Sequence, residues 1–235
     1  MSVAERVAVV REEIRLAALS AGRDPGEIKL LAAVKTQSVD RISQAVAAGV
    51  DAVGENRVQE MLSKLGSYGG TELHFIGKLQ KNKVKQVVGR VSLIHSVESV
   101  AQAEVISRFA ETQNIVQDVL AQVNIGREAS KSGFLPSELE RGVFAMRGLR
   151  GLRVRGIMCI PPLLGGENGG EEYFLETRNL FVDIRPKIID NGSIRSEEAF
   201  SVLSMGMSGD FAKAAALGST LVRVGSAIFG PRASA

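Results

Sequence analysis

Residues 28–36 read I-K-L-L-A-A-V-K-T, a short apolar run that ends in a lysine. Turn-forming residues bound the run on both sides, with D-P-G at 24–26 and S-V-D at 38–40. A continuous apolar run of this length between turn signals predicts a buried strand of a parallel sheet. The rest of the chain can be interpreted outward from this strand.

Lys35 is the informative residue of the run. Side chains alternate along a strand, so Lys35 shares a face with Leu31 and Ala33. In a closed barrel this face points inward, and the lysine would lie at the C-terminal end of the strand, where barrels carry their active sites. Burial at such a place favours the neutral amine of a lysine, which can form a Schiff base. The alternative is a lysine that closes the strand and extends to water.

Strand-like and helix-like segments alternate eight times along the chain. The predicted strands cover 28–36, 51–53, 73–77, 91–95, 118–125, 152–160, 200–205 and 221–224. The predicted helices cover 2–21, 39–48, 56–65, 81–88, 99–112, 136–146, 171–189 and 210–217. This order predicts an α/β fold, a single (β/α)8 TIM barrel over residues 1–235 with an extra N-terminal helix. A doubly wound open sheet is the alternative, but it needs fewer strands and usually a G-x-G-x-x-G turn, which does not follow Thr36.

Composition limits the classes of function. The 235 residues are 45% hydrophobic and 23% charged, with a net charge of +3, which suits a globular protein that binds small anions. Cys159 is the single cysteine, so an internal disulfide is excluded and a reducing compartment is expected. No apolar signal segment or membrane span is found in the sequence, so we expect a cytoplasmic protein. The lysines between Lys78 and Lys85 lack aromatic neighbours and do not share one helix face, so nucleic-acid binding is not expected.

Polar residues follow the last two predicted strands. Ser204 closes strand 200–205 and Ser208 begins the next helix, while Gly225 and Ser226 follow strand 221–224. Glycines and serines at adjacent strand ends present N–H groups and hydroxyls to a phosphate, and barrels often bind phosphate at these two positions. The alternative is that Ser208 and Ser226 simply cap two helices.

Two other polar residues lie at or near strand ends. Arg223 stands inside an apolar strand, where an arginine is costly unless it meets an acid or a ligand. Asn56 follows the second predicted strand and could contact a ligand or cap its helix. His74 and His95 are the only histidines, and their spacing gives no support for a metal site.

Seven segments in order along the chain resemble the pyridoxal 5′-phosphate (PLP) homeostasis protein family, the YggS/PROSC-like group. They are L-L-A-A-V-K-T at 30–36, G-E-N-R-V-Q-E at 54–60, H-F-I-G-K-L-Q-K-N-K at 74–83, Q-V-N-I-G-R-E-A-S-K-S-G at 122–133, R-G-I-M-C-I-P at 155–161, L-S-M-G-M-S at 203–208 and G-S-T-L-V-R-V-G-S-A-I-F-G at 218–230. The resemblance implies a PLP-binding barrel like the N-terminal domain of alanine racemase. Ala33-Val34 and Leu73 depart from residues common in the family, which affects only the polarity of the pocket.

The resemblance also implies a role for each polar residue described above. Lys35 matches the Schiff-base lysine of the family, and Asn56 lies beside the cofactor. Arg223 faces the pyridine nitrogen. The phosphate would be bound by Ser204, Ser208, Gly225 and Ser226.

We therefore expect a cytoplasmic, monomeric PLP-binding protein without robust turnover, which holds PLP on Lys35 and takes part in its homeostasis. PLP-dependent apoenzymes are candidate partners. An amino-acid racemase or related PLP enzyme is the alternative, and a cofactor-free Schiff-base aldolase would leave the phosphate turns unused. Racemisation requires two acid/base groups, and Lys35 supplies one. In alanine racemase the second comes from a domain after the barrel, whereas eleven residues follow Val224 here.

The glycine-rich segment 163–170 is expected to be a mobile surface loop.

Overall fold

The computed structural model describes residues 1–162, 170–190 and 200–231 of the chain. Residues 163–169, 191–199 and 232–235 lie outside this description, and with them almost all of the glycine-rich segment for which we expected a mobile loop.

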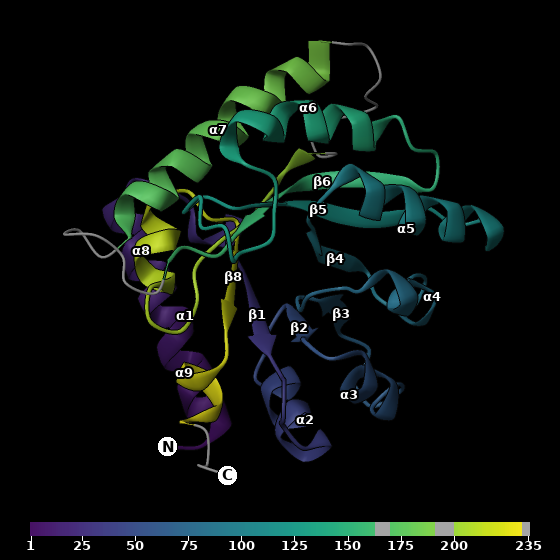
Figure 1. The fold of residues 1–235 in the computed structure, drawn as a ribbon. Helices are drawn as coiled ribbons and strands as arrows, with labels where there is room; N and C mark the ends of the chain where they lie inside the picture. Colours follow the sequence, from purple (N-terminus) through teal and green to yellow (C-terminus); the bar gives the residue numbers. More distant parts are fainter. Residues whose placement is uncertain (163–169, 191–199, 232–235) are drawn as a thin grey trace.

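Eight parallel strands form a closed barrel, as the alternation of segments predicts (Figure 1). The strands are β1 (Lys29–Ala33), β2 (Ala52–Glu55), β3 (Glu72–Phe75), β4 (Leu93–Val97), β5 (Gln117–Val123), β6 (Leu152–Cys159), β7 (Val202–Ser204) and β8 (Leu221–Val224). Each strand pairs with the next in sequence, and β8 pairs with β1 to close the barrel. The open-sheet alternative is therefore wrong.

Helices follow the strands on the outside of the barrel. They are α1 (Val3–Ser20), α2 (Val39–Ala47), α3 (Val58–Ser63), α4 (Val84–Val87), α5 (Val100–Thr112), α6 (Pro136–Arg147), α7 (Glu171–Asp190), α8 (Phe211–Ala216) and α9 (Ser226–Phe229). The predicted helix at 81–88 is a 3-10 turn, Lys81–Lys83, followed by the one-turn helix α4. The sequence analysis missed α9, because four residues are too short to show a helical period.

The extra N-terminal helix α1 begins with the predicted capping box. Ser2 Oγ accepts from the Glu5 N–H at 3.2 Å, and Glu5 Oε2 accepts from the Ser2 N–H at 2.7 Å. The apolar stripe of α1 is buried and consists of Val3, Val7, Val10, Ile14 and Ala18. The helix contacts α2, α8 and α9, so it covers the side of the barrel where β8 meets β1 (Figure 1).

The two faces of β1 enter two different cores. Leu30, Ala32 and Val34 belong to the large core between the sheet and the helices. Leu31 belongs to a small cluster with Ala52 and Leu221, residues paired with or next to β1, in the interior of the barrel. The predicted alternation is thus confirmed within β1, which ends at Ala33, whereas the strand predicted for 28–36 was too long: Lys35 follows in a turn. None of the helices in the described ranges combines the length and apolarity needed to cross a bilayer.

Candidate functional site

Lys35 lies in a turn directly after β1 and is half-buried. The next residue, Thr36, has φ 62°, in the left-handed region that β-branched residues rarely adopt. Its N–H donates to Glu60 Oε2 at 2.7 Å, and its hydroxyl donates to the Lys35 carbonyl at 2.6 Å. A strained residue persists only where its surroundings fix it, and strain of this kind is concentrated at functional sites.

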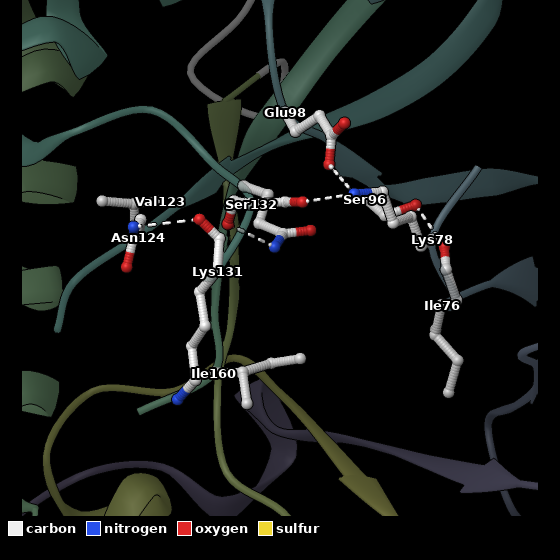
Figure 2. A pocket seen from close by; sticks show the side chains of 11 residues that line it. Ile76, Lys78, Ser96, Glu98, Val123, Asn124, Lys131, Ser132 and Ile160 are labelled. Atoms are coloured by element: carbon white, nitrogen blue, oxygen red, sulfur yellow. Dashed lines mark hydrogen bonds and ion pairs between the residues drawn. The ribbon is translucent and has the colours of Figure 1, made fainter. Parts of the chain in front are cut away.

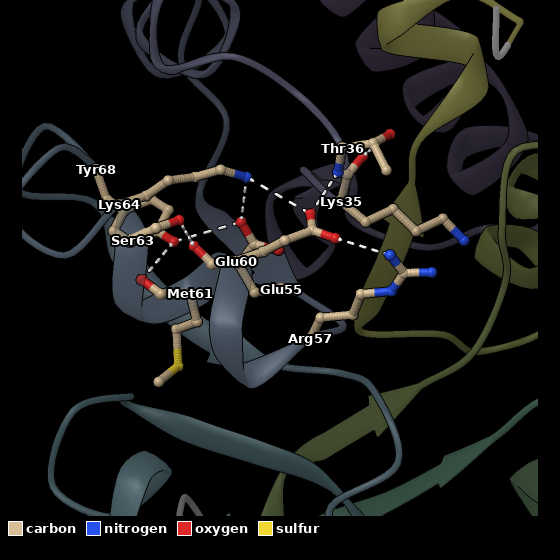
Figure 3. A network of polar contacts seen from close by, with 9 residues as sticks. All are labelled: Lys35, Thr36, Glu55, Arg57, Glu60, Met61, Ser63, Lys64 and Tyr68. Atoms are coloured by element: carbon tan, nitrogen blue, oxygen red, sulfur yellow. Dashed lines mark hydrogen bonds and ion pairs between the residues drawn. The ribbon is translucent and has the colours of Figure 1, made fainter. Parts of the chain in front are cut away.

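Glu60, on α3, links the Lys35 turn to a group of charges (Figure 3). Arg57 Nη1 lies 3.4 Å and Lys64 Nζ 3.8 Å from its carboxylate. Lys64 also lies 2.8 Å from Glu55 Oε1, and Glu55 is fully buried at the end of β2. Burial raises the pKa of Glu55, and the Lys64 contact opposes this shift. Figure 3 shows the Lys35 side chain extending away from Glu55 and Lys64.

The turns after β7 and β8 are joined by a serine. Ser208 Oγ accepts from the Gly225 N–H at 3.0 Å and from the Ala227 N–H at 3.3 Å. Ser226, between these two donors, makes no hydrogen bond to another described residue through its N–H or its hydroxyl. A Cβ atom on Gly225 would lie 3.5 Å from Ala33, so the joined turns adjoin the end of β1.

The simple capping interpretation of Ser208 and Ser226 is wrong. The N-cap residues of α8 and α9 are Asp210 and Gly225, and neither makes a side-chain capping bond. Ser208 instead bridges from the β7 turn to the start of α9.

Ser204 is not grouped with Ser208, contrary to the expected arrangement. It is the last residue of β7 and fully buried, and its hydroxyl accepts from Arg223 Nη1 at 2.6 Å. His95 Nδ1 lies 3.1 Å from the same oxygen. The reason is strand alternation, which turns the Ser204 side chain into the barrel, while Ser208 lies beyond the strand end.

Arg223 is only 5% exposed and has neutral hydrogen-bond partners. Besides Ser204, it donates through Nη2 to the Cys159 carbonyl at 2.9 Å. Within the described ranges no carboxylate forms an ion pair with it, and burial lowers the pKa of its guanidinium. A buried cation satisfied only by neutral acceptors is costly, as the sequence analysis anticipated.

Asn56 does not cap a helix, because the N-cap of α3 is Arg57. Its Oδ1 atom is buried and has no hydrogen-bond partner. The Asn56 carbonyl packs against Gly77, where a Cβ atom would come within 1.9 Å of it. A buried acceptor without a donor is rare in proteins and indicates a place for water or a ligand.

A cavity of about 280 Å³ opens at the same end of the barrel (Figure 2). Residues at and after the ends of β3 to β6 line it, among them Ile76, Ser96, Asn124 and Lys131. Lys78 crosses its rim and donates to Ser132 Oγ at 2.8 Å. Lys35, Asn56, Ser208 and Ser226 follow β1, β2, β7 and β8, so they occupy the other half of the mouth.

The two histidines are in contact, which the sequence analysis did not foresee. His74 Nδ1 lies 3.0 Å from His95 Nε2 inside the barrel. The available signal was their position: each stands on the inward face of its strand, where a polar side chain needs a partner. No cluster of three metal-binding side chains occurs in the described part of the chain.

Comparisons with known proteins agree with this fold. Residues 11–233 match the alanine racemase N-terminal domain family. A protein of Aquifex aeolicus named pyridoxal phosphate homeostasis protein is 39% identical, over 99% of both chains. The structure of PipY from Synechococcus elongatus with PLP bound is 30% identical, with a TM-score of 0.81 over 97% of this chain and 100% of that one.

A likeness in fold alone extends to alanine racemase of Clostridium difficile, at 14% identity and a TM-score of 0.69. That alignment covers 95% of this chain and 57% of the racemase. The nearly complete overlap with the homeostasis proteins, at much higher identity, distinguishes the two groups. The chain therefore belongs to the family of pyridoxal phosphate homeostasis proteins, within the alanine racemase N-terminal domain fold.

Proposed function

We propose that this protein binds PLP at the mouth of the barrel, holds it as a Schiff base on Lys35, and takes part in intracellular PLP homeostasis. The observation that carries the proposal is the junction of the β7 and β8 turns by Ser208 beside the end of β1. A phosphate-type turn therefore adjoins the end of β1, two residues before Lys35. The names of the relatives and the PLP bound to PipY support the same ligand.

The residues present fit the chemistry of PLP. Ser226 has an N–H and a hydroxyl without a described partner, next to the Ser208–Gly225 junction, which suits a phosphate. The orphaned Oδ1 of Asn56 indicates room for a ligand or water on the β2 side. The site thus offers the Lys35 amine, the turns after β7 and β8 for the phosphate, and the Arg223 guanidinium for the pyridine nitrogen.

When bound, PLP supplies an aldehyde that accepts an amine. Lys35 condenses with it through its neutral amine, with loss of one water. Ser208, Gly225 and Ser226 hold the phosphate, and Asn56 lies beside the ring. Arg223 donates toward the pyridine nitrogen, so no acid protonates that nitrogen there. We propose that Ser204 acts through Arg223 and does not bind the phosphate, because its hydroxyl is bonded to the guanidinium.

We further propose that the protein acts in the cytoplasm as a monomer and passes PLP to apoenzymes without robust turnover of its own. The names of the relatives refer to PLP homeostasis, which supports a role as a carrier of PLP over a role as an enzyme. The racemase alternative needs a second acid/base group at the mouth.

Borohydride trapping tests the proposal. After incubation with PLP and reduction, peptide mass mapping is expected to place the pyridoxyl group on Lys35. Lys35→Ala should abolish the label and leave the thermal unfolding midpoint nearly unchanged. Pyridoxal without the phosphate should bind far more weakly, because each charge-assisted bond to the phosphate contributes about 1.5–3 kcal/mol. A label found mainly on Lys78 or Lys131 would refute the assignment.

A further inference from the structure

A single chain of hydrogen bonds runs through the interior of the barrel from Arg223 to Glu72. Arg223 Nη1 donates to Ser204 Oγ at 2.6 Å, and Ser204 Oγ lies 3.1 Å from His95 Nδ1. His95 Nε2 lies 3.0 Å from His74 Nδ1, and His74 Nε2 lies 3.3 Å from Glu72 Oε2. The chain joins the cofactor end of β8 to the first residue of β3, at the opposite end of the barrel.

The contacts fix the direction of every donor. A guanidinium has no acceptor, so Ser204 Oγ must accept from Arg223. The Ser204 proton then points to His95 Nδ1, since the described residues offer it no other acceptor. His95 therefore carries its proton on Nε2 and donates it to His74 Nδ1. His74 in turn carries its proton on Nε2 and donates to Glu72, so both imidazoles are neutral.

The reverse direction leaves two contacts unsatisfied. His95 Nδ1 and Arg223 would both donate to Ser204, and the Ser204 proton would lack an acceptor among the described residues. His74 would then present a bare Nε2 to the Glu72 carboxylate at 3.3 Å, and the two lone pairs would repel each other. A second proton on His74 would relieve this repulsion, but His95 Nδ1 would still donate to Ser204, and the Ser204 proton would still lack an acceptor among the described residues.

The charges around the chain agree with this direction. Burial, together with the charge of the Arg223 guanidinium, holds the pKa of His95 well below its ordinary value. The hydrogen bond from His74 lowers the pKa of Glu72, and Lys29 and Arg155 contribute to the same shift. Glu72 and His74 face a cavity of about 530 Å³ at the N-terminal end of the barrel, which Lys29, Glu27, Asp118, Arg155 and Arg185 also line.

Aligned hydrogen bonds polarise one another, so the chain makes Ser204 a stronger acceptor than an isolated hydroxyl. This matters because Arg223 is buried without a carboxylate partner among the described residues. We propose that His95 and His74 are positioning residues: through Ser204 they fix the Arg223 guanidinium so that its remaining donors face the pyridine nitrogen of PLP. The role toward PLP rests on the proposed function, whereas the direction of the chain does not.

Nitrogen NMR of the protein without PLP, labelled with ¹⁵N-histidine, tests the direction. Long-range ¹H–¹⁵N correlations distinguish a bare ring nitrogen from a protonated one. Both histidines are expected to be neutral and protonated on Nε2. A proton on Nδ1 of His95 would overturn the proposal.

The role toward the cofactor is tested by the ratio of the dissociation constants of 1-deaza-PLP and PLP, which isolates the ring nitrogen. The ratio should be about ten or more in the unaltered protein, as for one charge-assisted hydrogen bond. His95→Leu should bring it close to one, while His95→Asn, which keeps an acceptor for Ser204, should retain most of it. A purely structural role would weaken both ligands equally and leave the ratio unchanged, which would refute the positioning role. Failure of PLP to bind at all would instead refute the proposed function, and the NMR result would still decide the direction of the chain.

Discussion

At the scale of single residues, the turn that carries Lys35 depends on a contact distant in sequence. The Glu60 carboxylate accepts the N–H of Thr36 at 2.7 Å and thereby stabilises its left-handed conformation. The hydrogen bond is charge-assisted; Thr36 is exposed, whereas the Glu60 side chain is only 21% accessible. Glu60 thus fixes the backbone next to the lysine, although it does not need to contact the ligand.

Glu60→Ala is expected to lower the free energy of unfolding by about 0.5–1.5 kcal/mol, the net contribution of one hydrogen bond, because water can solvate the exposed Thr36 N–H. It should also weaken PLP binding, because the Lys35 turn loses its fixed conformation. Urea unfolding and a PLP titration measure the two effects. Arg57→Ala is the matched control: it removes an exposed partner of Glu60 and should change stability by less than about 0.5 kcal/mol. Equal effects of the two substitutions would contradict this role of Glu60.

Cys159 offers a second test at this scale. The residue is buried, and burial raises the pKa of its thiol to about 11. At pH 7–8 the folded protein should therefore not react with a disulfide reagent such as DTNB, while the denatured chain should release one equivalent. The raised pKa adds stability that is complete below the unfolded value of about 8.5 and is lost as the pH rises toward 11. Rapid reaction of the folded protein with DTNB would contradict this and would show that the C-terminal end of β6, where Cys159 lies, opens to solvent.

At the scale of elements, α1 protects the seam where β8 and β1 close the barrel. Its residues Ile14 and Leu16 are two positions apart but face opposite ways: Ile14 is 3% exposed and Leu16 is 53% exposed. Parallel strands gain little from each other until the barrel is closed, so a helix over the seam should contribute directly to global stability.

Ile14→Ala is expected to cost about 2–5 kcal/mol, because it removes buried methyl groups and leaves a cavity against the core. Leu16→Ala should change the free energy of unfolding by less than about 0.5 kcal/mol, since the side chain is already in water. Thermal and urea unfolding of both variants check this. A large cost for Leu16→Ala would mean that this face of α1 is covered in solution.

The elements themselves were predictable to the degree that they are long and periodic. The capping box and apolar stripe of α1 and the alternation of β1 are local patterns, and both were found as expected. The segment 81–88 and helix α9 were not, because their helical pieces are only three or four residues long and show no helical period. The start of α9 also depends on Ser208, which follows a different strand.

At the scale of the whole molecule, the barrel decides which polar groups can meet at the mouth. Lys35 follows β1 there, whereas Tyr68 is buried outside the strand wall with its hydroxyl 3.4 Å from Glu55 Oε1. Tyr173 lies in the first turn of α7. Tyr68 is therefore not placed as the second acid/base group that racemisation requires.

We therefore expect no sustained turnover of amino acids by the PLP-loaded protein. Incubation with each common L- and D-amino acid, followed by chiral analysis and a keto-acid assay, measures this. Lys35→Ala controls for reactions of free PLP. Sustained turnover that Lys35→Ala abolishes would support the racemase alternative.

The sequence by itself determined the barrel and the strand that leads to Lys35, because these follow from local periodicity and from the order of segments, although β1 ends at Ala33 and Lys35 lies in the turn that follows. It also indicated Ser204, Ser208, Gly225 and Ser226 as a group, since adjacent strand ends meet at one end of a barrel.

Only the tertiary structure determined which of these polar groups form hydrogen bonds with one another. It separated Ser204 from Ser208, joined the β7 and β8 turns, and brought His74 and His95 to 3.0 Å although they are 21 positions apart. It also placed the Glu60 carboxylate on the Thr36 N–H. The physical reason is that contacts between different strands depend on their register and on closure of the barrel, and no local sequence pattern encodes these. The direction of a side chain within its own strand, by contrast, depends on the local backbone alone.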